Sequence, residues 1–497
     1  MSSYLIGIDI GTSACKVGLF DLSGNIISRF MQEYKTSYPQ KNYAEQDPES
    51  WWYAVKEGIQ RVLKESAINP IHIKAVGVDS MTPVLLAVDK NGIPVFPVLI
   101  WSDKRAEEEC RWIDNILGEE KIFNLSGNRT KSVYLAPKII WFKNNKPDLF
   151  KKTFCFLQPN GYINYKLCNI LCMDRSHSEL TLLADKYSGE WNIEVCNILG
   201  IPFEKLPEIK DCDNVIGYTT EYAASQTGLV KGIPVIAGGN DCAVAVFAMD
   251  ITKKGQSFLE MGFASNLGIC IDSPRSSAAC DLYHHVVKNK WILQSYSTTA
   301  GAALRWFKEE ICSFESDIAE KKNTDPYKHL DNLASKIPTG SDYLIFIPYL
   351  EGLALNRSIK GAFLGLSTAT TKEHMIRSVL EGCAYANRNN MEAVERTSQI
   401  EISEIIMVGG GANSALWAQI HSDVLNKKII INNIKDATIL GSSLLAGIST
   451  GEVKQVKDIA KKIKQDKIFV PNKKNTQIYD ELYNNFNRYL KNNFERK

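Results

Sequence analysis

The sequence lacks a dominant sign of charge. Lys and Arg together number 58 and Asp and Glu number 56, so the formal net charge is +2 over 497 residues. A chain without a basic excess has little with which to neutralise phosphates, so the composition gives no support to a dedicated nucleic-acid binder. The hydrophobic fraction of 44% excludes a disordered chain, and the length predicts two or three domains, each with its own core.

Long apolar runs and clustered metal ligands are also missing. Residues 243–249 form one of the longest uncharged apolar stretches and fall far short of the roughly 18 residues that a membrane-spanning helix needs. The first residues lack a basic region followed by an apolar core, so no secretory signal is expected. The 12 cysteines are scattered, and no second cluster completes a zinc set around Cys168 and Cys172. These absences predict a cytoplasmic protein with reduced thiols.

The chain is expected to open with a β-meander around a small glycine turn. An apolar run over 4–10 closes with Asp9-Ile10-Gly11-Thr12-Ser13, and further β-like runs follow at 15–20 and 26–30. A buried strand is expected at 73–78. The opening of the sequence therefore indicates an α/β protein in which a sharp turn joins the first two strands.

Around residue 230 this pattern starts again. A buried-strand run at 234–237 ends in Gly238-Gly239-Asn240-Asp241, and strands at 256–261 and 267–271 flank Gly262-Phe263-Ala264-Ser265. Two similar turns, one in each half, predict an internal duplication with a cleft between the halves. No Pro- or Ser-rich linker separates them, so we expect two tightly joined lobes, residues 1–248 and 249–497.

The first glycine turn is a candidate phosphate site. Gly11 lets the backbone turn so that successive N–H groups face an anion, and Thr12, Ser13 and Lys16 add donors of the kind that terminal phosphates need. Asp9, at the end of a buried strand, is suited to holding Mg²⁺ through water. The alternative is an ordinary hairpin with polar turn residues. The glycine spacing fits neither a Walker A loop nor a dinucleotide fingerprint.

Two further segments carry charged side chains that are candidates for catalysis or substrate binding. Asp241 follows a buried strand and a Gly-Gly pair, and an apolar run behind it predicts a helix whose dipole favours an ionised carboxylate able to accept a hydroxyl proton. The alternative is that Asp241 only caps that helix. Asp103 and Arg105, in Trp101-Ser-Asp-Lys-Arg105, pair an acceptor with a donor in the way used to bind sugar hydroxyls. The alternative for this pair is a surface salt bridge.

A glycine triplet, Gly409-Gly410-Gly411, follows a predicted strand and precedes a helix capped by Asn413 or Ser414. Backbone without side chains lets a flat base or a phosphate approach closely, although a lone triplet is weak evidence. His284-His285 has no third ligand nearby in the sequence, so a structural pair is expected rather than a metal site.

Taken together and in this order, these segments resemble the FGGY family of carbohydrate kinases over essentially the whole chain. Residues 6–13 are similar to the family's first phosphate motif, 238–241 to the segment with its catalytic aspartate, and 409–414 to its adenosine motif. The most specific match is Gly361-Ala-Phe-Leu-Gly-Leu366, then seven residues, then His374-Met-Ile-Arg-Ser-Val-Leu-Glu381. So many ordered matches make the separate alternatives improbable together.

Within the family, the sequence is most similar to the xylulokinases, and it departs from them at three places. Thr82, in Ser80-Met81-Thr82, stands where they carry a histidine that contacts the sugar. Phe263-Ala264 stands where the second phosphate turn usually has Thr-Ser, so backbone N–H groups must bind the phosphate there. After Gly352 the family's Gly-Glu-Arg-Thr-Pro segment is absent, and a shorter loop, Leu353–Arg357, takes its place.

The resemblance implies the two-lobed α/β fold of the actin, Hsp70 and sugar-kinase superfamily, which is ribonuclease H-like. This fold has duplicated mixed five-stranded sheets with flanking helices and a central cleft. The N-terminal lobe, 1–248, would bind the sugar and carry the catalytic base, and the C-terminal lobe, 249–497, would bind ATP. The implied reaction is ATP-dependent phosphorylation of a small sugar or polyol, with D-xylulose as the first choice and Mg²⁺ as the metal. A homodimer is also compatible with the family.

The resemblance assigns roles to residues of this sequence. Asp241 would be the catalytic base, and Asp9 would hold Mg²⁺. The residues expected to contact the sugar are Met81, Thr82, Asp103, Arg105 and Asp241. Those expected to bind ATP are Thr12, Ser13, Lys16, Gly262, Gly301, Arg305, Gly410, Gly411 and Ser414.

The sequence leaves other functions open. Gluconate, ribulose, L-xylulose, glycerol and four-carbon polyols are alternative substrates, because a single hydroxyl's hydrogen bonding can discriminate strongly between them. A non-sugar ATPase of the actin or Hsp70 type would share both phosphate turns but would not need Asp103 with Arg105. A sugar-binding relative without activity is conceivable because of Phe263.

Overall fold

The computed structural model describes residues 3–321, 323–352, 359–432, 434, 436–460 and 465–494. The shortened loop Leu353–Arg357 lies outside the described residues. The chain divides into two compact units: 1–253, 270–292 and 434–463 make up the first, and 254–269, 293–433 and 464–497 the second. This division differs from a single boundary at 248/249, because two segments from the second half of the sequence pack into the first unit.

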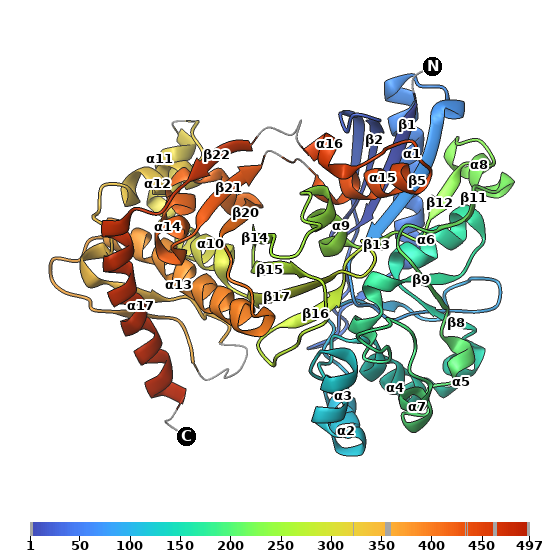
Figure 1. Cartoon of the computed structure of the whole chain (residues 1–497), viewed down its shortest axis with the longest axis horizontal. Helices are drawn as coiled ribbons and strands as arrows, with labels where there is room; N and C mark the ends of the chain where they lie inside the picture. Colours follow the sequence, from blue (N-terminus) through green and yellow to red (C-terminus); the bar gives the residue numbers. More distant parts are fainter. Residues whose placement is uncertain are drawn as a thin grey trace. The chain divides into compact units, whose positions relative to one another are not determined.

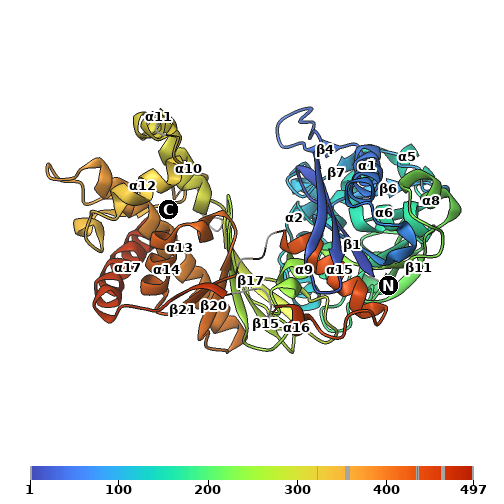
Figure 2. The same cartoon turned by 90° about the horizontal axis from the view of Figure 1, so that it is seen from above.

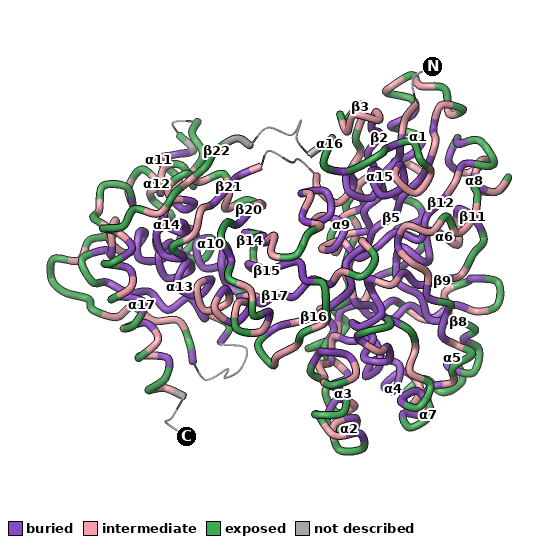
Figure 3. The backbone as a smooth tube through the Cα atoms, in the orientation of Figure 1, coloured by how far each residue is buried: buried purple, intermediate pink, exposed green. Residues whose placement is uncertain are grey.

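The first unit is built on a mixed sheet. Its strands are β1 (Tyr4–Ile10), β2 (Ala14–Asp21), β3 (Ile26–Glu33), β5 (Ile73–Ser80), β11 (Val215–Tyr218), β12 (Pro234–Ile236) and β13 (Gly239–Asn240). They run in the order β11-β12-β5-β1-β2-β3, with β13 beside β5 (Figure 1). β1 pairs with β2 antiparallel and with β5 parallel. The apolar runs predicted to be central strands are buried along nearly their whole length (Figure 3).

Helices cover this sheet. Those of the first unit are α1 (Pro48–Ser66), α2 (Glu107–Leu117), α3 (Glu119–Ser126), α4 (Leu135–Asn145), α5 (Pro147–Lys152), α6 (Pro159–Cys168), α7 (Ile193–Ile198), α8 (Glu221–Thr227), α9 (Asp241–Ala248), α15 (Ala437–Ser449) and α16 (Val456–Ala460). α1 packs on β2 and β3, and Asp47 caps its N-terminus by accepting a hydrogen bond from the N–H of Glu49. α15 comes from late in the sequence, yet it lies against β1, β5 and α9 (Figure 1, Figure 2).

The second unit repeats the same strand order. Its strands are β14 (Ser257–Met261), β15 (Ser265–Ile271), β17 (Trp291–Ser297), β20 (Glu404–Val408), β21 (Lys428–Asn432) and β22 (Gln465–Phe469). They run β17-β15-β14-β20-β21-β22, with β14 antiparallel to β15 and parallel to β20. Five of them, β17-β15-β14-β20-β21, match β3-β2-β1-β5-β12 in order. The duplication predicted from the two glycine turns is therefore present in the strand topology.

The main helices of the second unit are α10 (Ala300–Glu310), α11 (Ser313–Lys321), α12 (Pro326–Ala334), α13 (Lys372–Ser398), α14 (Ala415–Leu425) and α17 (Lys473–Phe494), with a hairpin of β18 (Ile345–Ile347) and β19 (Ala362–Leu364). The most specific sequence match ends at Glu381 in α13. This buried carboxylate accepts hydrogen bonds from the Ser341 hydroxyl at 2.7 Å and the Tyr479 hydroxyl at 2.8 Å, and it pairs with Arg377 at 2.8 Å. The motif therefore anchors a loop and α17 to α13.

A search of the helices in the described part of the chain found none that combines the length and the apolar character of a membrane span. The 12 cysteines are free thiols, and all except Cys242 are buried. The thiols thus serve as small apolar residues of the two cores.

Candidate active site

Acidic residues lie at the carboxyl ends of neighbouring parallel strands in the first unit. Asp9 in β1 lies opposite Asp79 in β5, and Gly239 in β13 lies opposite the same Asp79. Asp241 follows β13 directly as the first residue of α9. Because residues in register on parallel strands point to the same face, Asp9 and Asp79 stand side by side. The negative charge of Asp241 also raises the pKa of Asp79.

Each of the two strand aspartates has one oxygen bound and one oxygen unbound. Asp9 Oδ2 accepts from Lys16 Nζ at 3.0 Å and from Thr438 Oγ1 at 2.9 Å. Asp79 Oδ2 accepts from Ser442 Oγ at 2.5 Å. Oδ1 of Asp9 and Oδ1 of Asp79 are buried and have no hydrogen-bond partner among the described residues. Buried carboxylate oxygens normally accept a hydrogen bond. This face of the sheet therefore has two buried acceptor oxygens for which the described residues provide no donor.

The electrostatics of this cluster are governed by burial and by like charges. Burial raises the pKa of Asp79 well above its ordinary value, and the charges of Asp9 and Asp241 raise it further, against the opposing effects of Ser442 and Lys16. Burial alone would lower the pKa of Lys16, but the adjacent Asp9 carboxylate outweighs it and the net shift is upward. Lys16 therefore stays protonated in a region that carries more negative than positive charge.

The predicted phosphate turn joins β1 to β2 beside these aspartates. A Cβ built on Gly11 would lie 3.5 Å from Asp9 Oδ1, so the turn and the unbound oxygen are neighbours. Trp101 Nε1 donates to Thr12 Oγ1 at 2.8 Å, which leaves the hydroxyl proton of Thr12 free to be donated elsewhere. The side chain of Ser13 is exposed. Asp9, Thr12, Ser13 and Lys16 are thus brought together as the sequence predicted.

A buried hydrogen-bond network supports the turn that carries Asp241. Asn240 caps α9 by accepting from the N–H of Ala243 at 2.8 Å. The N–H of Asn240 donates to Ser176 Oγ at 2.8 Å, and its side-chain amide donates to the carbonyl of Ser176 at 2.7 Å. Ser176 Oγ in turn donates to Asp174 at 2.5 Å. The helix is therefore capped by Asn240, and Asp241 at its first position is not needed for that purpose.

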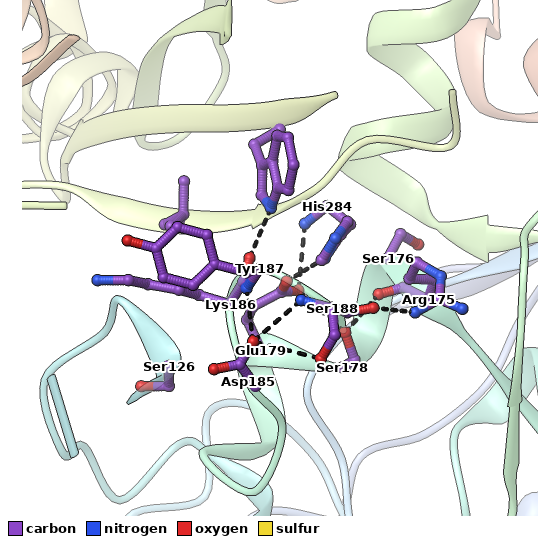
Figure 4. A network of polar contacts seen from close by, with 12 residues as sticks. Ser126, Arg175, Ser176, Ser178, Glu179, Asp185, Lys186, Tyr187, Ser188 and His284 are labelled. Carbon is purple, nitrogen blue, oxygen red and sulfur yellow. Dashed lines mark hydrogen bonds and ion pairs between the residues drawn. The ribbon is translucent and has the colours of Figure 1, made fainter. Parts of the chain in front are cut away.

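The turn at 175–181, next to this cap, holds two carboxylate–histidine pairs. His177 Nδ1 lies 2.6 Å from Asp174 Oδ2. Burial would raise the pKa of Asp174, but His177 and hydrogen-bond donors lower it below its ordinary value. Glu179 is buried, and it accepts from Ser178 Oγ at 3.1 Å and from the N–H of His284 at 3.2 Å, with the ring of His284 turned toward it (Figure 4). His284 thus has a carboxylate partner within the protein.

The predicted sugar-contact residues fall into two groups. Met81 and Thr82 follow β5 directly, two and three residues after Asp79. Met81 is buried, and the hydroxyl of Thr82 is shielded from solvent without a hydrogen-bond partner among the described residues. A shielded hydroxyl of this kind is available to a ligand. Because these residues continue the strand that carries Asp79, they lie at the same edge of the sheet.

Asp103 and Arg105 form a buried pair rather than a surface salt bridge. Arg105 Nε lies 2.9 Å from both oxygens of Asp103, and Arg105 Nη2 lies 2.7 Å from Glu45 Oε1. The guanidinium also stacks on the ring of Tyr43, 3.7 Å from its centroid. The side chains of Asp103 and Arg105 are 0% and 1% exposed. The pair holds its own loop in place, and its contact with a sugar stays a prediction.

In the second unit, glycines gather around the turn between β14 and β15. A Cβ built on Gly301, near the start of α10, would lie 2.1 Å from the carbonyl oxygen of Gly262, so only glycine permits this approach. A Cβ on Gly411 would lie 2.7 Å from Met261 Cβ, whereas one on Gly410 would meet nothing within 4 Å. The result is a surface of bare backbone at the carboxyl ends of β14 and β20.

Two other predicted nucleotide residues flank this glycine surface. Ser414 caps α14 by accepting from the N–H of Trp417 at 3.0 Å. Arg305 lies one turn into α10, is exposed and pairs with Glu309 at 2.9 Å. The structure thus brings Gly262 and Gly301 together and Gly410, Gly411 and Ser414 together, while the guanidinium of Arg305 is engaged on the helix surface.

Models of one protein family match both halves of the chain. The model of the FGGY family of carbohydrate kinases, N-terminal domain, matches residues 4–248, and the C-terminal-domain model matches 270–450. The chain belongs to the FGGY family of carbohydrate kinases. It is therefore an enzyme of the phosphotransferase class that acts on carbohydrates, as the resemblance of its motifs predicted.

Relatives of this FGGY kinase carry different substrate names. A xylulose kinase of Staphylococcus epidermidis is 27% identical over 490 residues, which cover 97% of this chain and 95% of the relative. A gluconokinase of Bacillus subtilis is also 27% identical, over 457 residues that cover 91% and 89%. The crystal structure of xylulose kinase from Rhodospirillum rubrum superposes with a TM-score of 0.91 at 24% identity and covers 98% of both chains. The two-lobed sugar-kinase fold is thereby confirmed.

The residues of the FGGY kinase fit a magnesium ion at the aspartate cluster. The two unbound carboxylate oxygens, Oδ1 of Asp9 and Oδ1 of Asp79, are hard donors of the type that Mg²⁺ prefers. No group of three or more His, Cys, Asp or Glu in the described ranges is arranged as a complete metal cage. A pair of carboxylates suits Mg²⁺, which takes one or two carboxylates and keeps waters or phosphate oxygens as its other ligands.

Two residues of this cluster, Asp79 and Ser442, are not among those predicted from the sequence. The predicted strand ends at Val78, whereas β5 continues to Ser80 and includes Asp79. The signal that singled out Asp9, an acidic residue at the end of a buried strand, applies equally to Asp79. Ser442 had no such signal, because only the packing of α15 on the first sheet brings its hydroxyl to Asp79.

Proposed function

We propose that this kinase transfers the terminal phosphoryl group of ATP to a small sugar or polyol, with a pentulose such as D-xylulose as the preferred class. The observation that carries the proposal is the convergence of Asp9, Asp79 and Asp241 at adjacent strand ends beside the turn at Thr12 and Ser13. Phosphoryl transfer needs positioning and charge neutralisation more than covalent chemistry from the protein. The carboxylates would position the acceptor hydroxyl and hold a cation, and Lys16 with the donors of the turn would offset the negative charge of the phosphates.

Asp241 is the proposed base. It is the first residue of α9, whose N-terminal dipole favours the ionised carboxylate. Capping by Asn240 and its link to Ser176 hold the backbone at this position. In the transfer, Asp241 would orient the attacking hydroxyl and accept its proton late. A carboxylate of ordinary basicity is adequate for this because the transition state is loose.

The phosphate groups are assigned to the β1–β2 turn. Thr12 and Ser13 supply hydroxyl and backbone donors, and Lys16 supplies a positive charge that Asp9 holds in place at 3.0 Å. Asp9 would hold Mg²⁺, which when bound neutralises charge on the transferred phosphoryl group. Gly262, Gly301, Gly410, Gly411 and Ser414 are the proposed contacts of the nucleotide in the second unit, with Arg305 at their margin.

The sugar is assigned to Met81, Thr82, Asp103, Arg105 and Asp241. Thr82 is supported by its shielded hydroxyl without a partner. Asp103 and Arg105 bond to each other, so a sugar hydroxyl would have to share donors with that pair. The relatives named xylulose kinase support a pentulose.

The test is ADP release measured with a panel of ketoses, polyols and aldonates. We expect release that depends on the sugar, with the highest kcat/KM for D-xylulose. Release that is equally fast without any sugar would contradict the proposal and indicate an ATPase. Sugar binding by calorimetry without ADP release would indicate a relative without activity.

Gluconate is the second candidate substrate. A gluconokinase relative matches at the same identity as the xylulose kinase relative, and Thr82 replaces the histidine typical of xylulokinases. A kcat/KM for gluconate above that for every ketose in the panel would decide in its favour, since a site built for one set of hydroxyls rejects analogues that leave its buried polar groups unpaired.

A further inference from the structure

α15 approaches the first sheet unusually closely. A Cβ built on Gly7 in β1 would lie 1.8 Å from the carbonyl oxygen of Ile439, and one on Gly77 in β5 would lie 2.1 Å from that of Ser442. Glycine at both strand positions is therefore what lets the helix backbone rest on the strands. At this distance, even the short hydroxyl side chains of the helix reach the carboxylates at the strand ends.

The helix binds one oxygen of each aspartate. Thr438 Oγ1 donates to Asp9 Oδ2 at 2.9 Å, and Ser442 Oγ donates to Asp79 Oδ2 at 2.5 Å. The residues are four apart, which places them on the same face of the helix. With each Oδ2 held by the helix, the position of each Oδ1 is restricted. Both Oδ1 atoms are buried and lack a hydrogen-bond partner in the described ranges.

The charges around these oxygens are unbalanced. Asp9 and Asp79 are 3% and 0% exposed, and the charge of Asp241, the first residue of α9, acts on Asp79. Lys16 is the cation bound to this group, through Asp9 Oδ2. Burying carboxylates without compensation is costly, so a site of this composition calls for additional positive charge. Two hard oxygens side by side suit a divalent cation that is bound partly by water.

We propose that Asp79 is a second carboxylate that holds the divalent cation together with Asp9, and that Ser442 of α15 orients it. This inference rests on the proposed function, because the cation is the one that accompanies ATP there. It assigns α15 a role in the reaction: its Thr438 and Ser442 hydroxyls set the direction of the two metal-facing oxygens. Thr438 and Ser442 are accordingly positioning residues, and Asp79 is a ligand of the ion or of its water.

The decisive experiment measures Mn²⁺ uptake by the full-length protein in the absence of nucleotide and sugar, from the loss of the free Mn²⁺ signal in electron paramagnetic resonance. We expect one bound ion per chain and a Kd that rises roughly 10- to 100-fold in Asp79→Asn, since groups around a metal contribute on this scale. Unchanged Mn²⁺ affinity in Asp79→Asn, or no uptake by the wild-type protein, would overturn the proposal. Asp79 would then be a buried carboxyl that stays neutral.

A neighbouring pair of serines provides a matched control. Ser442→Ala removes the hydroxyl from Asp79, and we expect the Kd for Mn²⁺ to rise roughly 2- to 10-fold, the loss expected for one hydrogen bond. Ser443→Ala removes a hydroxyl that donates to the carbonyl of Leu440 at 2.8 Å, within the same helix. We expect this variant to bind Mn²⁺ as the wild type does. Equal affinities in the two variants would contradict the role of Ser442.

A failure of the role proposed for Asp79 can be distinguished from a failure of the proposed kinase function. Thermal unfolding of each variant with and without Mn²⁺ tests whether a loss of affinity reflects misfolding, because a folded variant still unfolds in a cooperative transition and bound Mn²⁺ raises its midpoint. Sugar-dependent ADP release by the wild type tests the kinase reaction independently. A wild type that releases ADP with sugar, combined with unaltered Mn²⁺ binding in Asp79→Asn, would reject only the role of Asp79.

Discussion

The next-to-last residue of the first strand is acidic in both sheets: Asp9 in β1 and Glu260 in β14. In the first unit, Asp9 lies opposite Lys16 on β2 and opposite Asp79 on β5, and it is buried. An ammonium and a second carboxylate therefore flank it on both sides. The strand ends of this sheet concentrate charge in a place shielded from solvent.

The second unit places other chemistry at the matching positions. Glu260 lies opposite Asn266 on β15 and opposite Val408 on β20, and it is exposed. Its carboxylate accepts from the Asn266 amide at 3.0 Å. The turn beyond it, Gly262-Phe263-Ala264, lacks charged and hydroxyl side chains, and Phe263 is 68% exposed. The duplicated backbone thus carries a charged site in one unit and a surface of glycine backbone in the other.

The two sheets share the order of their strands, so residues occupy matching positions. The side chains at those positions nevertheless differ in charge and in burial. Whether an acid at the strand end becomes part of a reactive site depends on what lies against it. In the first unit, the hydroxyl of Thr438 in α15 donates a hydrogen bond to Asp9, and Asp79 lies beside that carboxylate. Glu260 has an amide partner on the sheet surface. Substitutions at matching positions of the two sheets can show whether the reaction belongs to the first of these two environments.

Asp241→Asn is expected to have the largest effect. An amide cannot accept the hydroxyl proton, so sugar-dependent ADP release should fall about 10²- to 10⁴-fold. ATP binding measured by calorimetry should remain nearly intact, because Asp241 is not among the residues assigned to the nucleotide. A variant that retains more than about a tenth of wild-type turnover would remove Asp241 from the role of base.

Asp9→Asn and Glu260→Gln form a pair at matching positions of the two sheets. We expect Asp9→Asn to raise the Mg²⁺ concentration needed for half-maximal activity about tenfold or more, because it removes a charged partner of the ion. Glu260→Gln should leave that concentration unchanged, since its carboxylate is exposed and accepts from the Asn266 amide. Equal effects of the two substitutions on the Mg²⁺ dependence would contradict the assignment of the ion to Asp9.

Phe263→Thr would make the second turn more like the first. A hydroxyl at this exposed position adds a donor toward a phosphate, and a hydrogen bond to a charged group is worth roughly a factor of ten. We expect the KM for ATP to fall by up to that factor while the KM for the sugar is unchanged. An unaltered KM for ATP would indicate that the turn at Gly262 does not approach the phosphates.

Each unit also buries a neutral histidine, His285 in the first and His421 in the second. Burial lowers the pKa of each from 6.5 to about 4. Between these values the unfolded chain binds more protons than the folded one, so the unfolding free energy falls as the pH falls through this window. Each histidine should account for about 1 kcal/mol of the loss between pH 7 and 5.5.

His285→Gln and His421→Gln test that pH dependence separately in the two units. Each variant should show a flatter dependence of the unfolding free energy on pH than the wild type, measured by urea denaturation at pH 7 and 5.5. A slope unchanged in both variants would place the titrating groups elsewhere. A change in only one variant would show that the two units respond differently to acid.

Much of the fold could be predicted because its signals are local. The apolar strands and the two glycine turns depend on residues close together in the sequence, and the structure has each of them. The burial of Asp103 with Arg105 could not be predicted in this way. A salt bridge on the surface and one beneath Tyr43 have the same sequence spacing, and only the packing around them distinguishes the two.

The sequence by itself determined the family, because the family follows from the order of motifs. It also determined the repeated strand–turn–strand units, which follow from nearest-neighbour backbone preferences. The same preferences place Asp9, Thr12, Ser13 and Asp241 at strand and helix ends. Only the tertiary structure decided that α15 lies on the first sheet and that Ser442 meets Asp79, 363 residues away. The physical reason is the close fit of a helix to glycine-lined strands, which no local pattern encodes.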